Sequence, residues 1–257
     1  MSLKNKTALI TGSTSGIGLG IAKALANQGA NIILNGFGDV DAAIGEVSSA
    51  GSRVEYHPAD LSKPLDIESL MGFAASKFDQ VDILVNNAGI QHVASLEDFR
   101  VQHWDAILAV NLSAAFHTTR LALPAMRASN WGRIINMGSV HALVASVNKA
   151  AYVAAKHGIV GLTKVTALET ATTGITCNAI CPGWVRTPLA LKQVEDKAKT
   201  LNISLEEATK LSLGEKEPSM QFTTTDDIGQ LVLFFCSPAG HNVRGVAWSM
   251  DGGWTAQ

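Results

Sequence analysis

The sequence predicts an α/β fold, with a doubly wound parallel sheet in a single domain that spans residues 1–257. Two observations predict this class. Short apolar runs alternate with longer segments of helical pattern, as expected for repeated βαβ units and a parallel sheet. Hydrophobic residues make up 47% of the chain and charged residues 16%, so one large core can form.

Seven short runs are the predicted strands. Most are rich in Ile, Val and Leu, as expected for strands covered by helices on both faces. They are 7–10, 31–34, 53–56, 82–85, 133–136, 175–180 and 245–250. Helix-length segments lie between them, for example 17–28, 66–78, 102–127, 149–170 and 226–236. Right-handed crossovers then place helices on both faces of the sheet.

Residues 187–222 interrupt this alternation, because they are polar and helix-prone and stand between two predicted strands. A surface insertion and a mobile lid over a site both explain such a segment. The sequence therefore predicts a helical substrate lid at 187–222, carried by the single domain.

Composition excludes several classes of protein. The formal net charge of -2 gives no general attraction to nucleic acid. Cys177, Cys181 and Cys236 form no CxxC pair, which favours a reduced, cytoplasmic protein over a disulfide or zinc framework. No cluster has metal-ligand spacing, so no metal is expected. No uninterrupted apolar run approaches the ~18 residues of a membrane span, and MSLKNKTALITG does not resemble a signal peptide, so no membrane partner is expected.

A glycine-rich turn, TGSTSGIG at 11–18, directly follows the first predicted strand and opens a helix. Glycine lets the backbone turn tightly and approach a diphosphate, whose charge is stabilised at a helix N-terminus. This placement is typical of Rossmann-type dinucleotide-binding domains. The contacts predicted in this turn are Gly12, Thr14, Gly16, Ile17 and Gly18.

The end of the second predicted strand favours NAD over NADP. No Arg or Lys occurs at 13–15 or 35–39, so nothing there neutralises a 2′-phosphate, although the usual acidic residue directly after the strand is also missing. Phe37 is predicted either near the adenine or in the core. Asp60 and Leu61, in the ADL sequence after the third strand, are predicted to hold the adenine.

Tyr152 and Lys156 are spaced i, i+4 in a predicted helix, so their side chains lie on one side of it. A free tyrosine, with a pKa of ~10, is a poor base at neutral pH. A cation one turn away favours the phenolate and is expected to bring the pKa of Tyr152 towards working pH. Tyr152 is therefore predicted to be the general base in oxidation of an alcohol and the general acid in the reverse reaction.

Together, these patterns resemble the classical short-chain dehydrogenases/reductases along essentially the whole chain. The shared features are TGSTSGIG, NNAG (86–89), Asn111, Ser139, the Tyr152-x-x-x-Lys156 pair and CPGWVRTP (181–188). The resemblance implies that Ser139 holds the reacting oxygen, that Lys156 also bonds the nicotinamide ribose, and that Asn111 organises a water in a proton relay. It implies further cofactor contacts from Asn87, Ala88, Gly89, Tyr152, Lys156, Pro182, Gly183, Val185 and Thr187.

Finer features are similar to the bacterial members that interconvert (R)-3-hydroxybutyrate and acetoacetate with NAD in ketone body metabolism. These features are NAGIQH (87–92), SVHALVAS (139–146), NKAAYVAAKHG (148–158), NAICPGWVRTPL (178–189) and DGGWTA (251–256). That similarity implies a homotetramer, and it assigns the substrate carboxylate to Gln91, His141, Lys149 and Gln193. Trp184 and Trp254 then wall off the short aliphatic tail, while Ser139 and Tyr152 meet the reacting oxygen. Without the similarity, His141 is read as a loop residue and Gln193 as a solvated helix residue.

Two alternatives stay open. The first alternative is a reductase of 3-oxoacyl thioesters within the same family. The second is a catalytically silent nucleotide-binding module. A thioester reductase more often uses NADP and needs room for a carrier arm. A silent module is expected to lack at least one of Asn111, Ser139, Tyr152 or Lys156, and all four are present.

Overall fold

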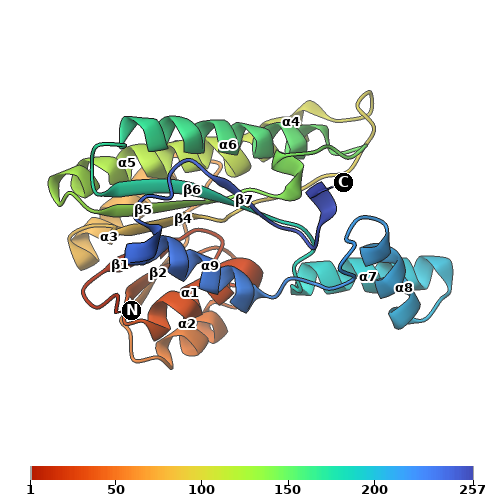
Figure 1. The fold of residues 1–257 in the computed structure, drawn as a ribbon, viewed down its shortest axis with the longest axis horizontal. Coiled ribbons are helices and arrows are strands. Elements are labelled where there is room, and N and C mark those ends of the chain that lie inside the picture. The colour runs from red at the N-terminus through yellow and green to blue at the C-terminus, as the bar shows by residue number, and fades with distance from the viewer. Residues whose placement is uncertain (1, 257) are drawn as a thin grey trace.

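A computed structural model describes residues 2–256 and contains a seven-stranded sheet in which every pair is parallel (Figure 1). Its strands are β1 Thr7–Ile10, β2 Asn31–Asn35, β3 Val54–His57, β4 Ile83–Asn86, β5 Gly132–Met137, β6 Ile175–Pro182 and β7 Ala247–Met250. Their order is β3-β2-β1-β4-β5-β6-β7, so the winding direction reverses between β1 and β4. The doubly wound fold class and the predicted strands are confirmed, with strand ends shifted by one or two residues.

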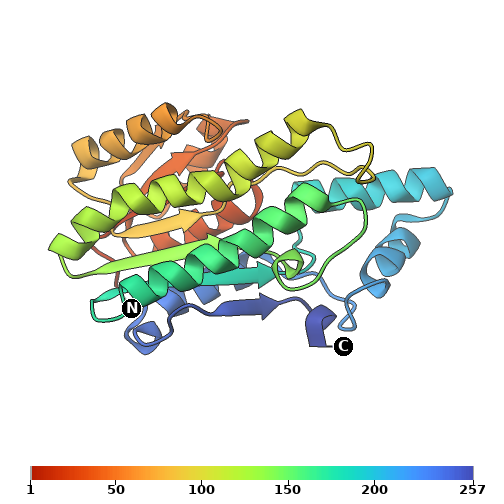
Figure 2. The ribbon, with the colours of Figure 1, turned by 90° about the horizontal axis from the view of Figure 1, so that it is seen from above.

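Helices cover both faces of the sheet (Figures 1 and 2). Helices α1, α2 and α9 pack on one face, while α3, α4, α5 and α6 lie on the other. Their bounds are α1 Gly16–Asn27, α2 Val40–Ser48, α3 Pro64–Phe78, α4 Val101–Leu108, α5 Ala114–Ala128, α6 Ala150–Glu169 and α9 Thr225–Cys236. Alternate residues along the strands feed two apolar cores. Leu25, Val232 and Phe235 fill the α1/α9 side, and Leu70 and Met126 fill the α3/α5 side.

Helices α4 and α5 form one continuous helical segment, Val101–Ala128, joined by a π-helical turn at Ala109–Ser113. By length and mean hydropathy this segment is long and apolar enough to cross a membrane, a test that core helices also pass. Polar residues interrupt it, and α5 packs against α3. The segment thus lies within the helical layer on one face of the sheet.

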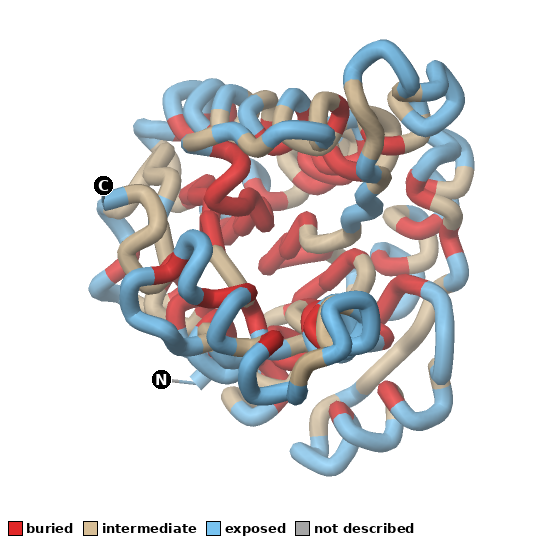
Figure 3. Tube along the Cα trace, turned by 90° about the vertical axis from the view of Figure 1, so that its right-hand side faces the viewer, coloured by how far each residue is buried: buried red, intermediate tan, exposed pale blue. Residues whose placement is uncertain are grey.

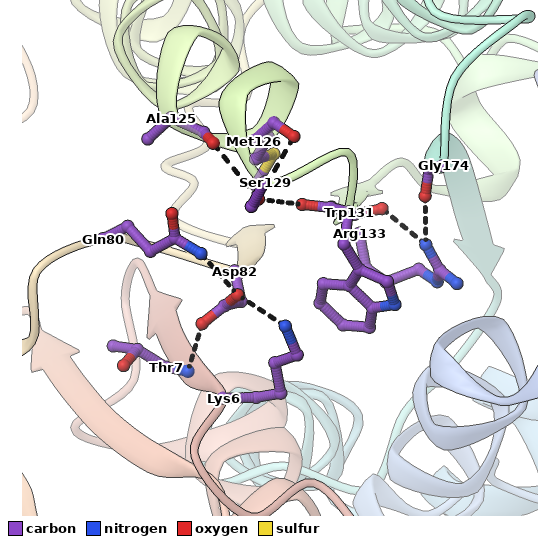
Figure 4. Close-up of polar contacts among 11 residues, drawn as sticks. Lys6, Thr7, Gln80, Asp82, Ala125, Met126, Ser129, Trp131, Arg133 and Gly174 are labelled. Carbon is purple, nitrogen blue, oxygen red and sulfur yellow. Dashed lines mark hydrogen bonds and ion pairs between the residues drawn. The ribbon is translucent and has the colours of Figure 1, made fainter.

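A polar cluster fixes the amino edge of the sheet, where β1, β4, β5 and β6 begin (Figure 4). The Asp82 carboxylate is buried and accepts hydrogen bonds from Lys6 Nζ, the Thr7 amide and Gln80 Nε2, each at 2.9 Å. Nearby, Arg133 Nη1 donates to the Gly174 carbonyl at 2.8 Å. These bonds satisfy charges that are costly to bury alone, and they leave the opposite, carboxyl edge of the sheet for other groups.

Residues 187–222 form two helices, α7 Pro188–Leu201 and α8 Leu205–Gly214, which project from the body at the carboxyl edge (Figure 1). The main packing partners of α7 and α8 are each other. Seen from this end, their outer residues are exposed, while buried residues lie on the inner elements (Figure 3). A parallel bridge between Val185 and Thr223 joins the two ends of the segment.

Candidate active site

Two adjoining cavities lie at the carboxyl edge of the sheet, with volumes of ≈ 430 Å³ and ≈ 320 Å³. Ile17, Asn87, Gly89, Thr187 and Leu189 are among the residues that line both. The larger cavity follows the ends of β1 and β2, and the smaller one follows β5 and β6 and reaches under α7. Ligands of doubly wound sheets bind at this edge, next to the point where the strand order reverses.

The glycine-rich turn shapes the floor of the larger cavity. Gly12 and Gly16 have φ values of +61° and +54°, which side chains with a Cβ rarely adopt. A Cβ on Gly12 would lie 2.9 Å from Ala88 Cα. Ser15 precedes α1 without a side-chain cap, so the first backbone amides of the helix stay available to an anion.

Gly18 does not line either cavity, and its predicted role as a contact stays a prediction. A Cβ on Gly18 would overlap the Gly12 carbonyl and lie 2.8 Å from Ser13 Cα. This glycine is therefore required for close packing of α1 under the turn. Gly12, Thr14, Gly16, Ile17, Asn87, Ala88 and Gly89 do line the cavities.

The far end of the larger cavity is lined by Phe37, Asp60 and Leu61, as predicted for an adenine site. Phe37 is 71% exposed, so the alternative that it belongs to the core is wrong. Asn35 Nδ2 donates to the carbonyls of His57 and Ala59 at 3.1 and 3.0 Å, while its buried Oδ1 has no partner among the described residues. The residues lining this cavity include no Arg or Lys. Free amides, a glycine floor and this unpaired buried oxygen fit a dinucleotide.

Ser139, Tyr152 and Lys156 come together on the wall of the smaller cavity. Lys156 is 4% exposed, its Nζ donates to the Met137 carbonyl at 2.6 Å, and it lies 5.6 Å from the centroid of the Tyr152 ring. Burial lowers the pKa of Lys156 to about 8. Burial also raises the pKa of Tyr152, while a hydrogen bond with Ser139 acts in the opposite direction. The expected lowering of the tyrosine pKa is not found, because desolvation outweighs that hydrogen bond.

Asn111 lies in the π-helical turn and does not line either cavity. Its Oδ1 accepts from the Ile90 amide at 2.8 Å, and its Nδ2 donates to the Ile90 carbonyl at 2.9 Å. Both ends of this buried side chain are thus occupied by the segment that follows NNAG. The side chain fixes Ile90, which lines both cavities.

The predicted substrate residues all line the smaller cavity: Gln91, Ser139, His141, Lys149, Tyr152, Trp184, Gln193 and Trp254. His141 is buried between Ser139 Oγ, 3.3 Å from Nδ1, and Ser146 Oγ, 2.9 Å from Nε2. Burial, assisted by the charge of Lys149, lowers the pKa of His141 to about 4, so the imidazole is neutral at pH 7. The Trp254 ring stands edge-on to it, with centroids 5.6 Å apart.

Lys149 directly precedes α6, at the N-cap position but without a side-chain cap hydrogen bond, and is half-buried beside this cavity. Burial lowers the pKa of its ammonium. None of the described acidic side chains forms an ion pair with it, whereas exposed lysines such as Lys23 and Lys210 do have partners. A cation without a partner on a cavity wall is suited to receive an anion from outside the chain.

The structure adds residues that the sequence patterns did not indicate. Met137, Gly138, Val140 and Ala190 line the smaller cavity, and Ser15, Asn35, Gly36, Ala59, Val110 and Pro188 line the larger one. Most of them adjoin a motif, and adjacency is the one signal that pointed to them. The four remaining predicted cofactor contacts, Pro182, Gly183, Val185 and Thr187, line the smaller cavity after β6.

The arrangement can transfer a proton at a substrate oxygen beside a bound dinucleotide. A phenol, a hydroxyl and an ammonium share one wall, which is the set of groups that acid–base catalysis at an alcohol or carbonyl needs. Lys149, which has no ion pair among residues 2–256, and the neutral imidazole of His141 line the same cavity, and they suit the charged end of a small molecule.

Comparisons with known proteins agree with this geometry. The family model described as short chain dehydrogenase matches residues 6–198. A D-beta-hydroxybutyrate dehydrogenase of Cupriavidus necator is 64% identical over 257 residues, which cover 99% of this chain and 100% of that protein. A protein of the same name from Rhizobium meliloti is 52% identical over 256 residues, 98% of this chain and 99% of that protein.

Two solved structures have the same fold. An actinorhodin polyketide ketoreductase with NADPH has a TM-score of 0.92 and 32% identity, and the match covers 100% of both chains. A levodione reductase has a TM-score of 0.90 and 29% identity, over 98% of each chain. Both share the fold of this chain, and the ketoreductase structure contains NADPH.

Proposed function

The chain belongs to the short chain dehydrogenase family, and from that membership we propose that it interconverts (R)-3-hydroxybutyrate and acetoacetate with NAD. The observation that carries the substrate assignment is the ammonium of Lys149, which has no ion-pair partner among the described residues and lies in the cavity that also holds Ser139 and Tyr152. A 3-hydroxy acid places its carboxylate two carbons from the carbinol, so it has a negative charge for Lys149 and an oxygen for Tyr152. The names of two relatives covered along nearly their whole length support the same substrate.

Bound NAD supplies the hydride acceptor. In oxidation, the Tyr152 phenolate takes the hydroxyl proton as the carbon–hydrogen bond at the carbinol breaks. The Ser139 hydroxyl holds the reacting oxygen, and the Lys156 ammonium favours the phenolate. In reduction, Tyr152 returns its proton to the carbonyl oxygen of acetoacetate, a direction that suits a phenol whose pKa burial has raised.

The substrate carboxylate is placed on Lys149, with Gln91, His141 and Gln193 donating hydrogen bonds to its other lone pairs. The low pKa of His141 keeps this imidazole neutral, so it is not a second cation. To donate to the carboxylate, its single N–H must leave Ser139 or Ser146, which contact the two ring nitrogens. Trp184 and Trp254 enclose the aliphatic part. Gln193 comes from α7, so this placement needs the 187–222 segment to lie over the cavity.

We propose NAD as the cofactor because the cavity at the end of β2 has no cationic side chain among its lining residues. A 2′-phosphate there would lose its hydration without gaining a charged partner. The nearest acidic side chain after β2 is Asp39, whose carboxylate accepts a hydrogen bond from the Ala42 amide and so caps α2. Comparing kcat/KM for NAD with that for NADP tests this assignment, and equal values would overturn it.

We also propose a cytoplasmic homotetramer. Support for assembly comes from apolar side chains on the outer surface of the α5/α6 layer, where Phe116, Val165 and Leu168 are 48%, 53% and 77% exposed. Support for a reduced compartment comes from Cys177, Cys181 and Cys236, which are all free thiols. Light scattering after size exclusion tests the tetramer, and a monomer would contradict it.

One assay separates the proposed function from its alternatives. NADH formation is measured with (R)-3-hydroxybutyrate and with its (S) enantiomer, and NADH consumption with acetoacetate and a 3-oxoacyl thioester. The (R) acid and acetoacetate should be turned over far faster than the other two. Preference for the thioester would identify a thioester reductase, and nucleotide binding without turnover of any of these compounds would identify a silent module.

A further inference from the structure

Glu217 is a buried carboxyl group to which neither the motifs nor the mechanism gives a role. It lies three residues after the end of α8 and is 1% exposed. Its Oε1 accepts a hydrogen bond from the Trp184 backbone amide, and its Oε2 is buried without a donor among the described residues. Glutamate is rarely buried without a specific partner, so this position calls for an explanation.

The hydrogen bond of Glu217 ties together the two ends of the 187–222 segment. Trp184 stands just before that segment, and Glu217 stands near its far end. The Trp184 carbonyl accepts from the Thr223 amide at 3.0 Å, and the Arg186 amide donates to the Thr223 carbonyl at 2.9 Å. Trp184 is therefore held on its amide side by a carboxylate and on its carbonyl side by backbone, so its position depends on both.

Gly183 makes this contact possible. A Cβ at position 183 would overlap Glu217 Oε1 and lie 3.1 Å from Asp251 Cα. The glycine that was predicted as a cofactor contact thus has a second requirement, which is the space for a carboxyl group behind the backbone. Any side chain here would push Glu217 away from the Trp184 amide.

We propose that Glu217 is a positioning residue. It holds Trp184, and with it the Pro182–Val185 turn, against the substrate and the dinucleotide. The proposal deepens the proposed function and rests on it, because Pro182, Gly183, Trp184 and Val185 all line the cavity assigned to substrate. Glu217 touches none of the reacting groups. It acts through the backbone of Trp184.

The surroundings of Glu217 supply a chemical signature for this role. Desolvation and the charge of Asp251 raise the pKa of Glu217 to about 7, although the Trp184 amide opposes the shift. The charged groups near it are Asp251, which is itself buried, and Lys216, its neighbour in the chain. The carboxyl group therefore changes charge near neutral pH, and a glutamine in its place keeps the acceptor oxygen but does not titrate.

The test compares Glu217→Gln with Glu217→Ala, and uses Glu206→Ala as a control. Glu206 is an exposed carboxylate on α8 that pairs with Lys210 of the same helix. Hydrogen exchange of the peptide containing the Trp184 amide, corrected for intrinsic rates, reports the contact without any assay of activity. Loss of one hydrogen bond to a charged group corresponds to about tenfold or more in an equilibrium.

We expect Glu217→Ala to speed exchange of the Trp184 amide and to lower kcat/KM, each by about tenfold. Glu217→Gln should keep both within about threefold of the wild type and should remove a titration near pH 7 from the pH profile of kcat/KM. Glu206→Ala should change neither quantity. Thermal melting checks that each variant is folded.

Unchanged amide protection and unchanged kcat/KM in a folded Glu217→Ala would overturn the proposal. If Glu217→Ala does not fold, Glu217→Gln decides alone: faster Trp184 exchange despite the retained oxygen, or an unaltered titration near pH 7, would also overturn it. A wild-type protein that fails to oxidise (R)-3-hydroxybutyrate would refute the substrate assignment, while the exchange data would still judge the contact.

Discussion

Lys149 and Lys156 lie on the same side of α6, yet the chain gives them different surroundings. Lys156 donates to the Met137 carbonyl and faces the Tyr152 ring. Lys149 has no ion-pair partner among the described residues and faces the cavity. We therefore propose that Lys156 serves the acid–base group, while Lys149, without an ion pair among the described residues, binds the charged end of a ligand.

Lys149→Ala tests this division. We expect kcat/KM for 3-hydroxybutyrate to fall by an amount that corresponds to roughly 2–4 kcal/mol of transition-state stabilisation. This is the range for removing one partner of a desolvated charge pair. NAD affinity should change little. The methyl ester carries no charge, so the preference for acid over ester should shrink in the variant. Lys164→Ala, which changes an exposed lysine farther along α6, is the control. An unchanged acid-to-ester ratio would refute the carboxylate contact.

Tyr152→Phe keeps the ring and removes the ionisable oxygen. We expect turnover to fall by about 10²–10⁴-fold, the contribution of acid–base catalysis, with NAD binding retained. Because burial raises the pKa of Tyr152, wild-type oxidation should accelerate as pH rises and reduction should not. Initial rates in both directions between about pH 6 and 9 check this. A variant that keeps more than about a tenth of the rate would exclude Tyr152 as the acid–base group.

His141 and Glu217 should give stability opposite dependences on pH. The pKa of His141 falls to about 4, so the unfolded chain binds more protons than the folded chain between pH 4 and 6.5, and stability decreases as pH falls through that window. The pKa of Glu217 rises to about 7 from 4.5, so stability decreases as pH rises from 4.5 to 7. Each slope reaches at most ~1.4 kcal/mol per pH unit.

The two slopes should largely cancel in the wild type. Urea denaturation between about pH 5 and 6.5 should therefore give nearly constant midpoints for the wild type. His141→Gln should lose stability towards neutral pH, and Glu217→Gln should lose it towards acid. Three parallel curves would show that neither group changes its proton affinity on folding.

At the scale of elements, we expect α7 and α8 to move together. They pack mainly on each other, and Lys197 of α7 pairs with Glu215, which directly follows α8. We expect residues 187–222 to gain protection from hydrogen exchange when NAD and acetoacetate are added together, since closure brings Gln193 to the substrate. The α5 segment, Ala114–Ala128, serves as the internal control. Equal protection of 187–222 with and without ligands would argue against a lid.

Element types were predictable where the apolar pattern is long, and less so where local geometry decides. Helix α2 is short and buries Ala43 and Val47, so its pattern was too weak to indicate a helix. The π-helical turn around Asn111 has no signature in a periodicity of 3.6 residues. Its bonds to Ile90 join positions 21 residues apart, and spacing does not reveal such a contact.

At the site, the sequence indicated which residues lie together where chemistry requires a residue type. Ser139, Tyr152, Lys149 and Lys156 line one cavity, and their roles there stay predictions. The direction of the Tyr152 pKa could not be inferred from the pair alone, because it depends on how far the phenol is buried. Glu217 gave no signal, since an isolated glutamate after a polar helix is normally exposed.

Across the whole molecule, the two edges of the sheet have separate tasks. The amino edge is closed by Asp82 and its partners, and the carboxyl edge carries the cavities. Asp82→Ala should therefore lower the free energy of unfolding by roughly 2–4 kcal/mol, because it leaves the Thr7 amide and Lys6 without an acceptor. Activity per folded molecule should stay near that of the wild type.

Urea denaturation and active-site titration of the folded fraction measure both expectations. Asp105→Ala is the control, since Asp105 is exposed on α4. A large loss of kcat in fully folded Asp82→Ala would show that the two edges are coupled after all.

The position of β6 has a consequence for biosynthesis. All eight of its residues are buried, and one of its edges is covered only by β7, near the end of the chain. Until the ribosome has released residues 225–250, β6 has one unpaired edge, and α1 lacks its cover from α9. Such an intermediate presents an apolar strand edge to other nascent chains, which is a hazard for aggregation. A premature stop before residue 225 should therefore yield an insoluble product and not a truncated enzyme.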